Sequence, residues 1–237
     1  MGLRRTFMLA RAFRLEQTDP VAFYALLGRD TVALVERYRD ISGTSVLEVG
    51  GGPGHIAVAF REAGARAFFV EPSWEEMGER GRSRGWGVVA DGYVLPMKDA
   101  TFDVCCCSNV LEHVGDPWSF LDEMIRVTRP GGLVFVAFTN WLSPHGGHET
   151  APWHYLGGSW AARHYERKHG RPPKNLFGES LFNLRVGEVM RWARRTPQVE
   201  ILDCFPRYYP HWARGIVAMP GIRELATWNL ALALQRR

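Results

Sequence analysis

Short apolar runs alternate with amphipathic stretches along the first 138 residues of the chain. Five of these runs predict strands, at residues 46–49, 67–71, 88–91, 102–108 and 133–138. Between the first two runs, apolar residues recur at helical spacing from Ile56 to Ala63, and Gly64 marks the end of this helix. Strands that alternate with helices at this spacing are typical of an α/β fold with parallel strands.

The second half of the chain begins with a long irregular segment. Residues 139–183 are rich in glycine, proline, histidine and aromatic residues, and only a short helix near 160–168 is predicted there. The elements predicted beyond it are a helix at 184–195, a strand at 199–205, helices within 212–228 and a strand at 230–234.

The first predicted strand ends in an acidic residue and a cluster of glycines, spaced Glu48-x-Gly50-x-Gly52-x-Gly54. Glycine adopts positive φ and lets a ligand lie directly against the backbone. The free amide groups of the helix that follows also face such a ligand. The dinucleotide-binding spacing G-x-G-x-x-G is not met, because His55 stands where close helix packing requires a third glycine.

The glycine spacing, with the polar residues at the ends of the later strands, resembles the class I S-adenosylmethionine-dependent methyltransferases, in particular the type 11 family. These motifs cover residues 45–138. The resemblance implies S-adenosylmethionine as cofactor and S-adenosylhomocysteine as product. It places the methionine part of the cofactor on the glycine loop, with Glu48 orienting its amino group, and the ribose on Glu71. The other cofactor-binding residues that it implies are Asp91, Gly92, Asn109 and His113.

The resemblance also implies the fold and the division of the chain. We expect a Rossmann-like, seven-stranded mixed sheet with helices on both faces, an antiparallel seventh strand and an insertion after strand 5. The chain is then a single domain over residues 1–237. Its expected parts are an N-terminal helical lid at 1–43, with Phe23 and Tyr24 as candidate lid residues, a cofactor-binding core at 44–138, an acceptor-binding insertion at 139–183 and the rest of the sheet at 184–237.

Histidines gather in the insertion, in the run His145-Gly146-Gly147-His148-Glu149. Imidazole titrates near neutral pH, so this run offers a general base for a hydroxyl acceptor. We expect His148, or failing that His145, to take the proton, with Glu149 orienting the ring. The plainer alternative is that His145 and His154 only hydrogen-bond to the loop backbone. No metal ligands are assigned, and a role for Mg²⁺ is left open.

A sulfonium methyl group needs no protein nucleophile, only an acceptor atom held in line behind it. The histidines favour a hydroxyl acceptor, and the aromatic residues of the insertion suit the apolar faces of a sugar. We therefore expect an O-methyltransferase acting on a sugar or glycan. A lipid or quinone-like acceptor is the alternative, as is a protein that binds the cofactor without catalysis. The expected substrate-binding residues are Trp141, Trp153, His154 and Tyr155.

Composition adds limits. The chain has 237 residues, a formal net charge of +4 and no nucleic-acid-reading motif, so a nucleic-acid acceptor is not expected. No stretch approaches the length of a membrane span. Four cysteines, three of them consecutive in a predicted buried strand, indicate a reducing cytoplasm. The expected partner is a small-molecule or oligosaccharide acceptor, and a homodimer is left open.

Overall fold

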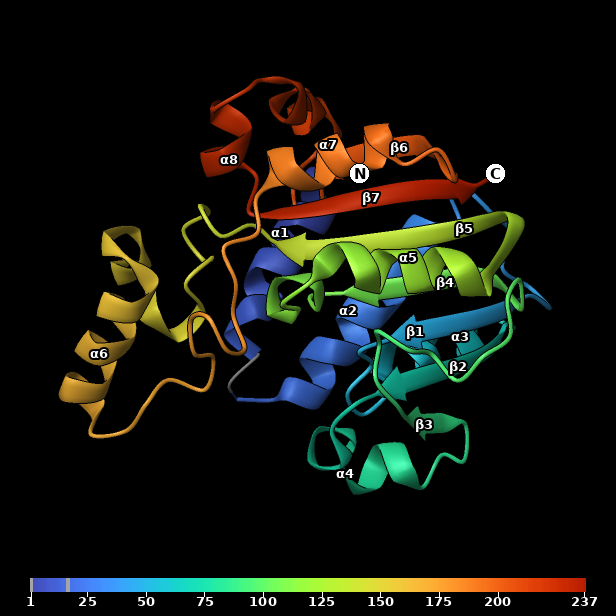
Figure 1. Ribbon diagram of the computed structural model, residues 1–237, viewed down its shortest axis with the longest axis horizontal. Helices are drawn as coiled ribbons and strands as arrows, with labels where there is room; N and C mark the ends of the chain where they lie inside the picture. The colour runs from blue at the N-terminus through green and yellow to red at the C-terminus, as the bar shows by residue number, and fades with distance from the viewer. Residues whose placement is uncertain (1, 16–17) are drawn as a thin grey trace.

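Seven strands form one mixed sheet in the computed structural model, which describes residues 2–15 and 18–237 (Figure 1). Their order across the sheet is β3-β2-β1-β4-β5-β7-β6. The strands are β1 (Ser45–Val49), β2 (Arg66–Glu71), β3 (Gly87–Val89), β4 (Phe102–Ser108), β5 (Thr128–Thr139), β6 (Val199–Pro206) and β7 (Asn229–Arg236). Only β7 among them runs antiparallel to its neighbours β5 and β6. The predicted seven-stranded sheet with an antiparallel last strand is confirmed.

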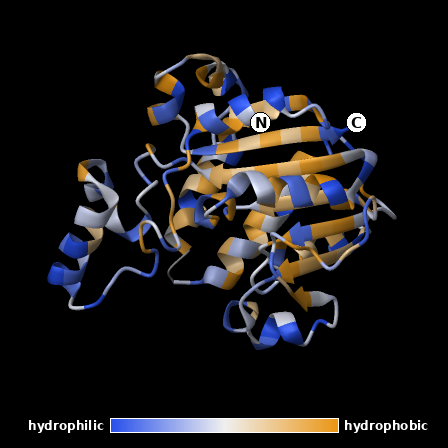
Figure 2. Ribbon diagram, viewed as in Figure 1, coloured by the Kyte–Doolittle hydropathy of each residue, from blue (hydrophilic) through white to orange (hydrophobic). Residues whose placement is uncertain are grey.

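Helices cover both faces of this sheet. One face carries α2 (Pro20–Val35), α3 (His55–Glu62) and α4 (Trp74–Arg82), and the other carries α5 (Pro117–Val127) and α7 (Val186–Arg195). Side chains alternate along a strand, so Val46 and Leu47 of β1 join opposite cores. The strands are accordingly apolar over most of their length (Figure 2).

Two of these helices begin at the same kind of sequence signal. Asp19 and Asp116 cap α2 and α5 by accepting hydrogen bonds from backbone amides of the first turn. A proline follows each aspartate, at a position whose N–H would have no intrahelical partner.

The β5 strand differs from the prediction, because Thr128 already pairs with Phe102 of β4 and a register shift follows. The strand therefore begins before the predicted range of 133–138, with an irregular start at residues 128–132.

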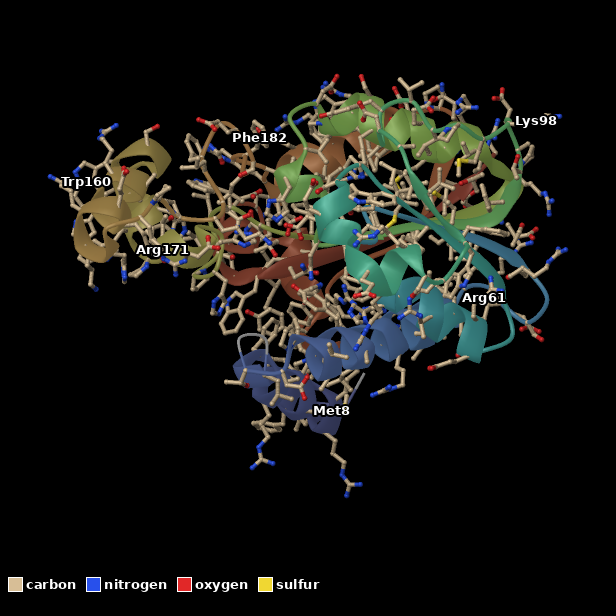
Figure 3. All side chains as sticks on the ribbon, turned by 90° about the horizontal axis from the view of Figure 1, so that it is seen from below. Met8, Arg61, Lys98, Trp160, Arg171 and Phe182 are labelled. Atoms are coloured by element: carbon tan, nitrogen blue, oxygen red, sulfur yellow. The ribbon has the colours of Figure 1, made fainter. Side chains whose placement is uncertain are left out.

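The segments that position the site lie at the carboxyl ends of the parallel strands. After β4 comes the short helix η2 (Leu111–His113), and the insertion after β5 holds η3 (His148–Thr150), η4 (Trp153–Leu156) and α6 (Gly158–His169). The insertion extends beyond the ends of β4 and β5, with α6 standing off from the sheet (Figures 1 and 3). The remaining helices, η5 (His211–Ala218) and α8 (Ile222–Ala226), connect β6 to β7.

The N-terminal segment is fastened to the core by a buried ion-pair network. The N-terminal segment consists of α1 (Leu3–Ala12), η1 (Phe13–Leu15) and α2. Residues 1 and 16–17 of the expected lid lie outside the described residues. Arg5 of α1 forms two hydrogen bonds with Asp30 of α2, at 2.6 and 2.8 Å. Arg207, fully buried after β6, lies 3.5 Å from the same carboxylate. None of the helices within the described residues is long and apolar enough to cross a bilayer.

Candidate active site

The glycine loop turns sharply over the carboxyl end of β1. Gly50 and Gly52 have φ angles of 75° and 50°, and Gly50 N donates to the Val70 carbonyl oxygen at 2.8 Å. A Cβ atom at Gly52 would meet only one atom within 4 Å, the Glu76 carbonyl oxygen at 4.0 Å. A ligand can therefore lie directly against the backbone at Gly52, which fits the methionine part of the expected cofactor.

Glu48 lies beneath this loop and is almost completely buried. Its Oε2 atom accepts a hydrogen bond of 2.7 Å from Ala57 N in the first turn of α3. Burial raises the pKa of Glu48 to about 8, although the Ala57 amide acts in the opposite direction. Its expected contact with the amino group of the cofactor stays a prediction.

Further polar groups line the same edge of the sheet. Glu71, at the tip of β2, accepts from Gly52 N at 2.9 Å and from Ser73 N at 3.1 Å. Asp91 is exposed after β3 and accepts from Tyr93 N at 2.9 Å. The next residue must be glycine, since a Cβ at Gly92 would lie 2.4 Å from the Phe120 ring. Both carboxylates lie near the ends of adjacent strands, and their expected contacts with the cofactor stay predictions.

The loop after β4 and the N-terminal segment complete this surface. Asn109 has a φ of 58°, and its Oδ1 accepts from Asn229 Nδ2 at 2.8 Å. Tyr24 of α2 stacks on His55, the first residue of α3, with ring centroids 5.9 Å apart. Phe23, the other expected lid residue, is buried in the small core between α1 and α2. Tyr24 is therefore the expected lid residue that lies beside the glycine loop.

Three side chains converge at the border between η2 and the insertion. Glu112, His113 and His148 each offer one ligand atom, and these three atoms lie within 4.8 Å of one another. We call them the Glu–His–His cluster. The His113 and His148 rings stand 5.0 Å apart at an angle of 64°. The cluster joins the expected cofactor loop to the expected acceptor segment.

Within the cluster, two buried atoms, Glu112 Oε2 and His148 Nε2, have no hydrogen-bond partner among the described residues. Glu112 is 1% exposed, and its other oxygen accepts from Thr139 N at 2.9 Å. Burial lowers the pKa of His148, against the attraction of Glu112. His148 also adopts a φ of 48°, which is strained for a residue other than glycine. Strain of this kind is common at functional sites.

The other two expected catalytic residues lie elsewhere. His145 stacks on Phe13 and contacts Trp228, so it faces the N-terminal segment and the end of the β6–β7 connection. Both carboxylate oxygens of Glu149 accept from Asn175 Nδ2, at 2.9 and 3.1 Å. Glu112 is the carboxylate that joins His148 in the cluster, and the expectation that Glu149 orients the His148 ring stays a prediction.

The four expected substrate-binding residues divide into two pairs. His154 is 1% exposed, and its Nε2 lies 3.1 Å from the Ser143 carbonyl oxygen, which is the plainer alternative stated for it above. Trp141 packs against the His154 ring and is likewise buried. In this structure both form the interior of the insertion and neither offers an exposed contact surface. Trp153 and Tyr155 are 45% and 47% exposed.

Sequence reasoning did not assign a role to Glu112, although it directly precedes His113. The signal was present, because a carboxylate and an imidazole were adjacent in the loop after β4. This adjacent pair indicates a site only when His148 lies beside it. His148 is 36 residues further along the chain, and the path of the insertion brings it to the cluster. The carbonyl oxygen of Ser180 was also missed, and it lies 2.6 Å from His113 Nδ1.

Comparison with known proteins defines the class. Residues 47–136 match the type 11 family described as a methyltransferase domain. Two uncharacterized methyltransferases, from Mycolicibacterium gilvum and Mycobacteroides abscessus, are 48% and 47% identical to this chain. They cover 98% and 99% of it, and the matches span 94% and 95% of their own length. A solved S-adenosylmethionine-dependent methyltransferase from Mesorhizobium loti has a TM-score of 0.61 at 19% identity, covering 88% of this chain and 98% of its own.

The fold and the site thus define an S-adenosylmethionine-dependent methyltransferase. The chain belongs to the type 11 methyltransferase family, with S-adenosylhomocysteine as its second product. The glycine loop, Glu71 and Asp91 lie at the carboxyl ends of adjacent parallel strands, and their contacts with that cofactor stay predictions.

Proposed function

We propose that this methyltransferase acts on a hydroxyl group of a sugar or glycan. The observation that carries the proposal is the Glu–His–His cluster, whose Glu112 Oε2 and His148 Nε2 atoms are buried and have no hydrogen-bond partner within the described part of the chain. A hydroxyl must be polarised or deprotonated as it attacks the methyl group, whereas an amine or an activated carbon depends less on such help. The cofactor, when bound, supplies the electrophilic methyl group.

The chain's own residues then hold the acceptor and polarise or deprotonate its hydroxyl group. Glu112 of the cluster follows Asn109 by only three residues, and His113 is itself an expected cofactor-binding residue, so a hydroxyl against the cluster would lie next to the expected cofactor surface. Trp153 and Tyr155 expose aromatic rings on the same insertion, and such rings pack on the apolar face of a sugar. Positioning of this kind supplies much of the catalysis in a transfer that needs no protein nucleophile.

A lipid acceptor is the second candidate, because α1 exposes an apolar side flanked by arginines. Leu3, Phe7 and Met8 are 55%, 66% and 44% exposed, beside the exposed Arg4 and Arg11. A helix of this composition binds anionic bilayer surfaces. Such binding would bring the active site to an acceptor that resides in a membrane.

The proposal is tested by the position of a labelled methyl group in the product. The protein is incubated with methyl-¹³C cofactor and either soluble oligosaccharides or acceptor lipids in anionic vesicles, and the product is analysed by NMR. An O-methyl signal on a sugar is the expected result. A methyl group on carbon or nitrogen, or label on the lipid fraction alone, contradicts the proposal. Cofactor binding without transfer to any acceptor indicates a non-catalytic protein.

We also propose the cytoplasm as the compartment of the reaction. Cys105, Cys106, Cys107 and Cys204 are free thiols, which suits a reducing compartment. A homodimer stays a prediction.

A further inference from the structure

The Glu–His–His cluster brings together one carboxylate oxygen and two imidazole nitrogens that can each serve as a metal ligand. The carbonyl oxygen of Ser180 cannot donate a hydrogen, so His113 Nδ1 donates to it at 2.6 Å, and in the neutral ring the Nε2 lone pair is left free. Neither His148 Nε2 nor Glu112 Oε2 has a hydrogen-bond partner in the part of the chain that the structure describes. A buried carboxylate oxygen without a partner is unfavourable unless a cation accompanies it.

The outer contacts of the cluster are those of a metal site. Ligating histidines generally donate their second nitrogen to a carbonyl or carboxylate, which fixes the ring and its tautomer. His113 does this with Ser180, and Glu112 is held at its other oxygen by Thr139 N. Both anchors are backbone groups, one in the insertion and one at the end of β5, so the first two ligand positions are set by the fold itself.

The third ligand position depends on a tightly packed turn. His148 follows Gly147, where a Cβ would lie 2.5 Å from atoms of the His154 side chain. The turn therefore packs closely against the buried His154, which is itself held by the Ser143 carbonyl oxygen. This packing holds His148 at its positive φ and keeps its ring beside that of His113.

We propose that Glu112, His113 and His148 bind one divalent transition-metal ion. The inference rests on the proposed function in one respect, because it assigns the ion the task of activating the acceptor hydroxyl. Two imidazole nitrogens and one carboxylate oxygen favour zinc, cobalt or iron(II), whereas magnesium and calcium prefer oxygen ligands throughout. The ion is therefore of a different class from the Mg²⁺ considered from the sequence.

Three protein ligands leave a coordination position open. The acceptor hydroxyl occupies it, and the ion lowers the pKa of that hydroxyl so that its proton passes to water. The oxygen then forms its bond to the methyl carbon while the sulfur–carbon bond of the cofactor breaks. His148 acts as a ligand in this arrangement, and the ion replaces it as the group that activates the hydroxyl.

The test is a metal titration in the absence of cofactor and acceptor. The full chain is freed of metal with a chelator and titrated with Co²⁺, whose visible absorption reports the ligand set, and bound Co²⁺ is then displaced with Zn²⁺. One equivalent is expected to bind with a nitrogen-and-oxygen spectrum, and Mg²⁺ is expected not to compete. Glu112→Gln and His148→Ala should each lower the affinity by at least about 100-fold, the upper end of the loss known for outer-shell partners.

His164→Ala is the matched control, because His164 lies on α6 of the same insertion and stacks on Trp160 away from the cluster. It should bind Co²⁺ as the wild type does. Circular dichroism verifies that each variant is folded. The proposal is overturned if wild-type protein binds Co²⁺ no more tightly than His148→Ala, a comparison that does not depend on turnover. Tight metal binding by a chain that methylates no hydroxyl would instead overturn only the proposed function.

Discussion

Glu71 and Gly52 are joined by a hydrogen bond of 2.9 Å from the Gly52 amide to the Glu71 carboxylate. The tip of β2 and the glycine loop after β1 therefore form one continuous surface, although the two residues are 19 positions apart. This surface combines a negative charge with exposed backbone. We expect the ribose hydroxyls of the cofactor to lie against the carboxylate and its methionine part against the backbone.

Replacing Glu71 by Ala is expected to weaken the binding of S-adenosylhomocysteine without unfolding the protein. Loss of hydrogen bonds to a charged acceptor costs about 1.5–3 kcal/mol, which corresponds to roughly 10- to 100-fold in affinity. Isothermal titration calorimetry measures this directly. Glu79→Ala, an exposed position on α4, is the control and should bind as wild type. Unchanged affinity in folded Glu71→Ala protein would remove Glu71 from the cofactor site.

Two glycines of the same loop should respond differently to alanine. Both have positive φ, so each substitution costs about 1–2 kcal/mol of stability from backbone strain. The new methyl group at Gly52 enters open space, whereas at Gly54 it would lie 2.7 Å from the buried Phe69 ring, which adds about 1–3 kcal/mol. Gly54→Ala should therefore unfold at lower urea concentration than Gly52→Ala.

Cofactor binding should show the reverse order in protein that remains folded. Gly52→Ala occupies space where the backbone meets the ligand, so it should lose more affinity for S-adenosylhomocysteine than Gly54→Ala does. Equal losses of stability and of affinity in the two variants would contradict the expectation that the cofactor lies against the backbone at Gly52.

The buried Glu48 carboxyl makes stability depend on pH. Its folded pKa of about 8 lies above the value of 4.5 for a free side chain, so the folded state holds its proton more tightly than the unfolded state. The protonated Glu48 carboxyl therefore stabilises the folded state fully below pH 4.5, and this stabilisation is lost as the pH rises toward about 8. The wild-type free energy of unfolding should therefore fall relative to that of Glu48→Gln over this window. A difference that is constant with pH would exclude a raised pKa.

The ion pair between the N-terminal segment and the core should be sensitive to neutralisation. Asp30→Asn leaves the fully buried Arg207 without its carboxylate partner and weakens the attachment of α1 through Arg5. Breaking one side of a buried pair costs about 3–5 kcal/mol. Urea unfolding measures the loss, with Glu36→Gln as control, at an exposed position directly after α2. A loss as small as that of the control would show that the network contributes little.

The sheet, and the polar residues at the carboxyl ends of its strands, could be predicted because their sequence patterns are local. A strand, its terminal acid and the glycines that follow occupy adjacent positions, so Glu48, Glu71 and Asp91 could be placed at strand ends from spacing alone. The position of His148 could not be obtained in this way. The insertion lacks periodicity, and its path depends on distant contacts such as that between Trp141 N and the Leu184 carbonyl oxygen. Chain proximity therefore suggested Glu149 as the partner of His148, whereas the fold supplies Glu112.

The most direct test of the account is the single-turnover rate of methyl transfer in wild-type and His148→Ala protein, measured at saturating cofactor and acceptor. Both proteins are first shown to bind S-adenosylhomocysteine equally, since His148 is outside the expected cofactor surface. If the cluster activates the acceptor hydroxyl, the variant should be slower by about 10²- to 10⁴-fold. A rate within a few-fold of wild type would contradict the assignment of hydroxyl activation to the Glu–His–His cluster.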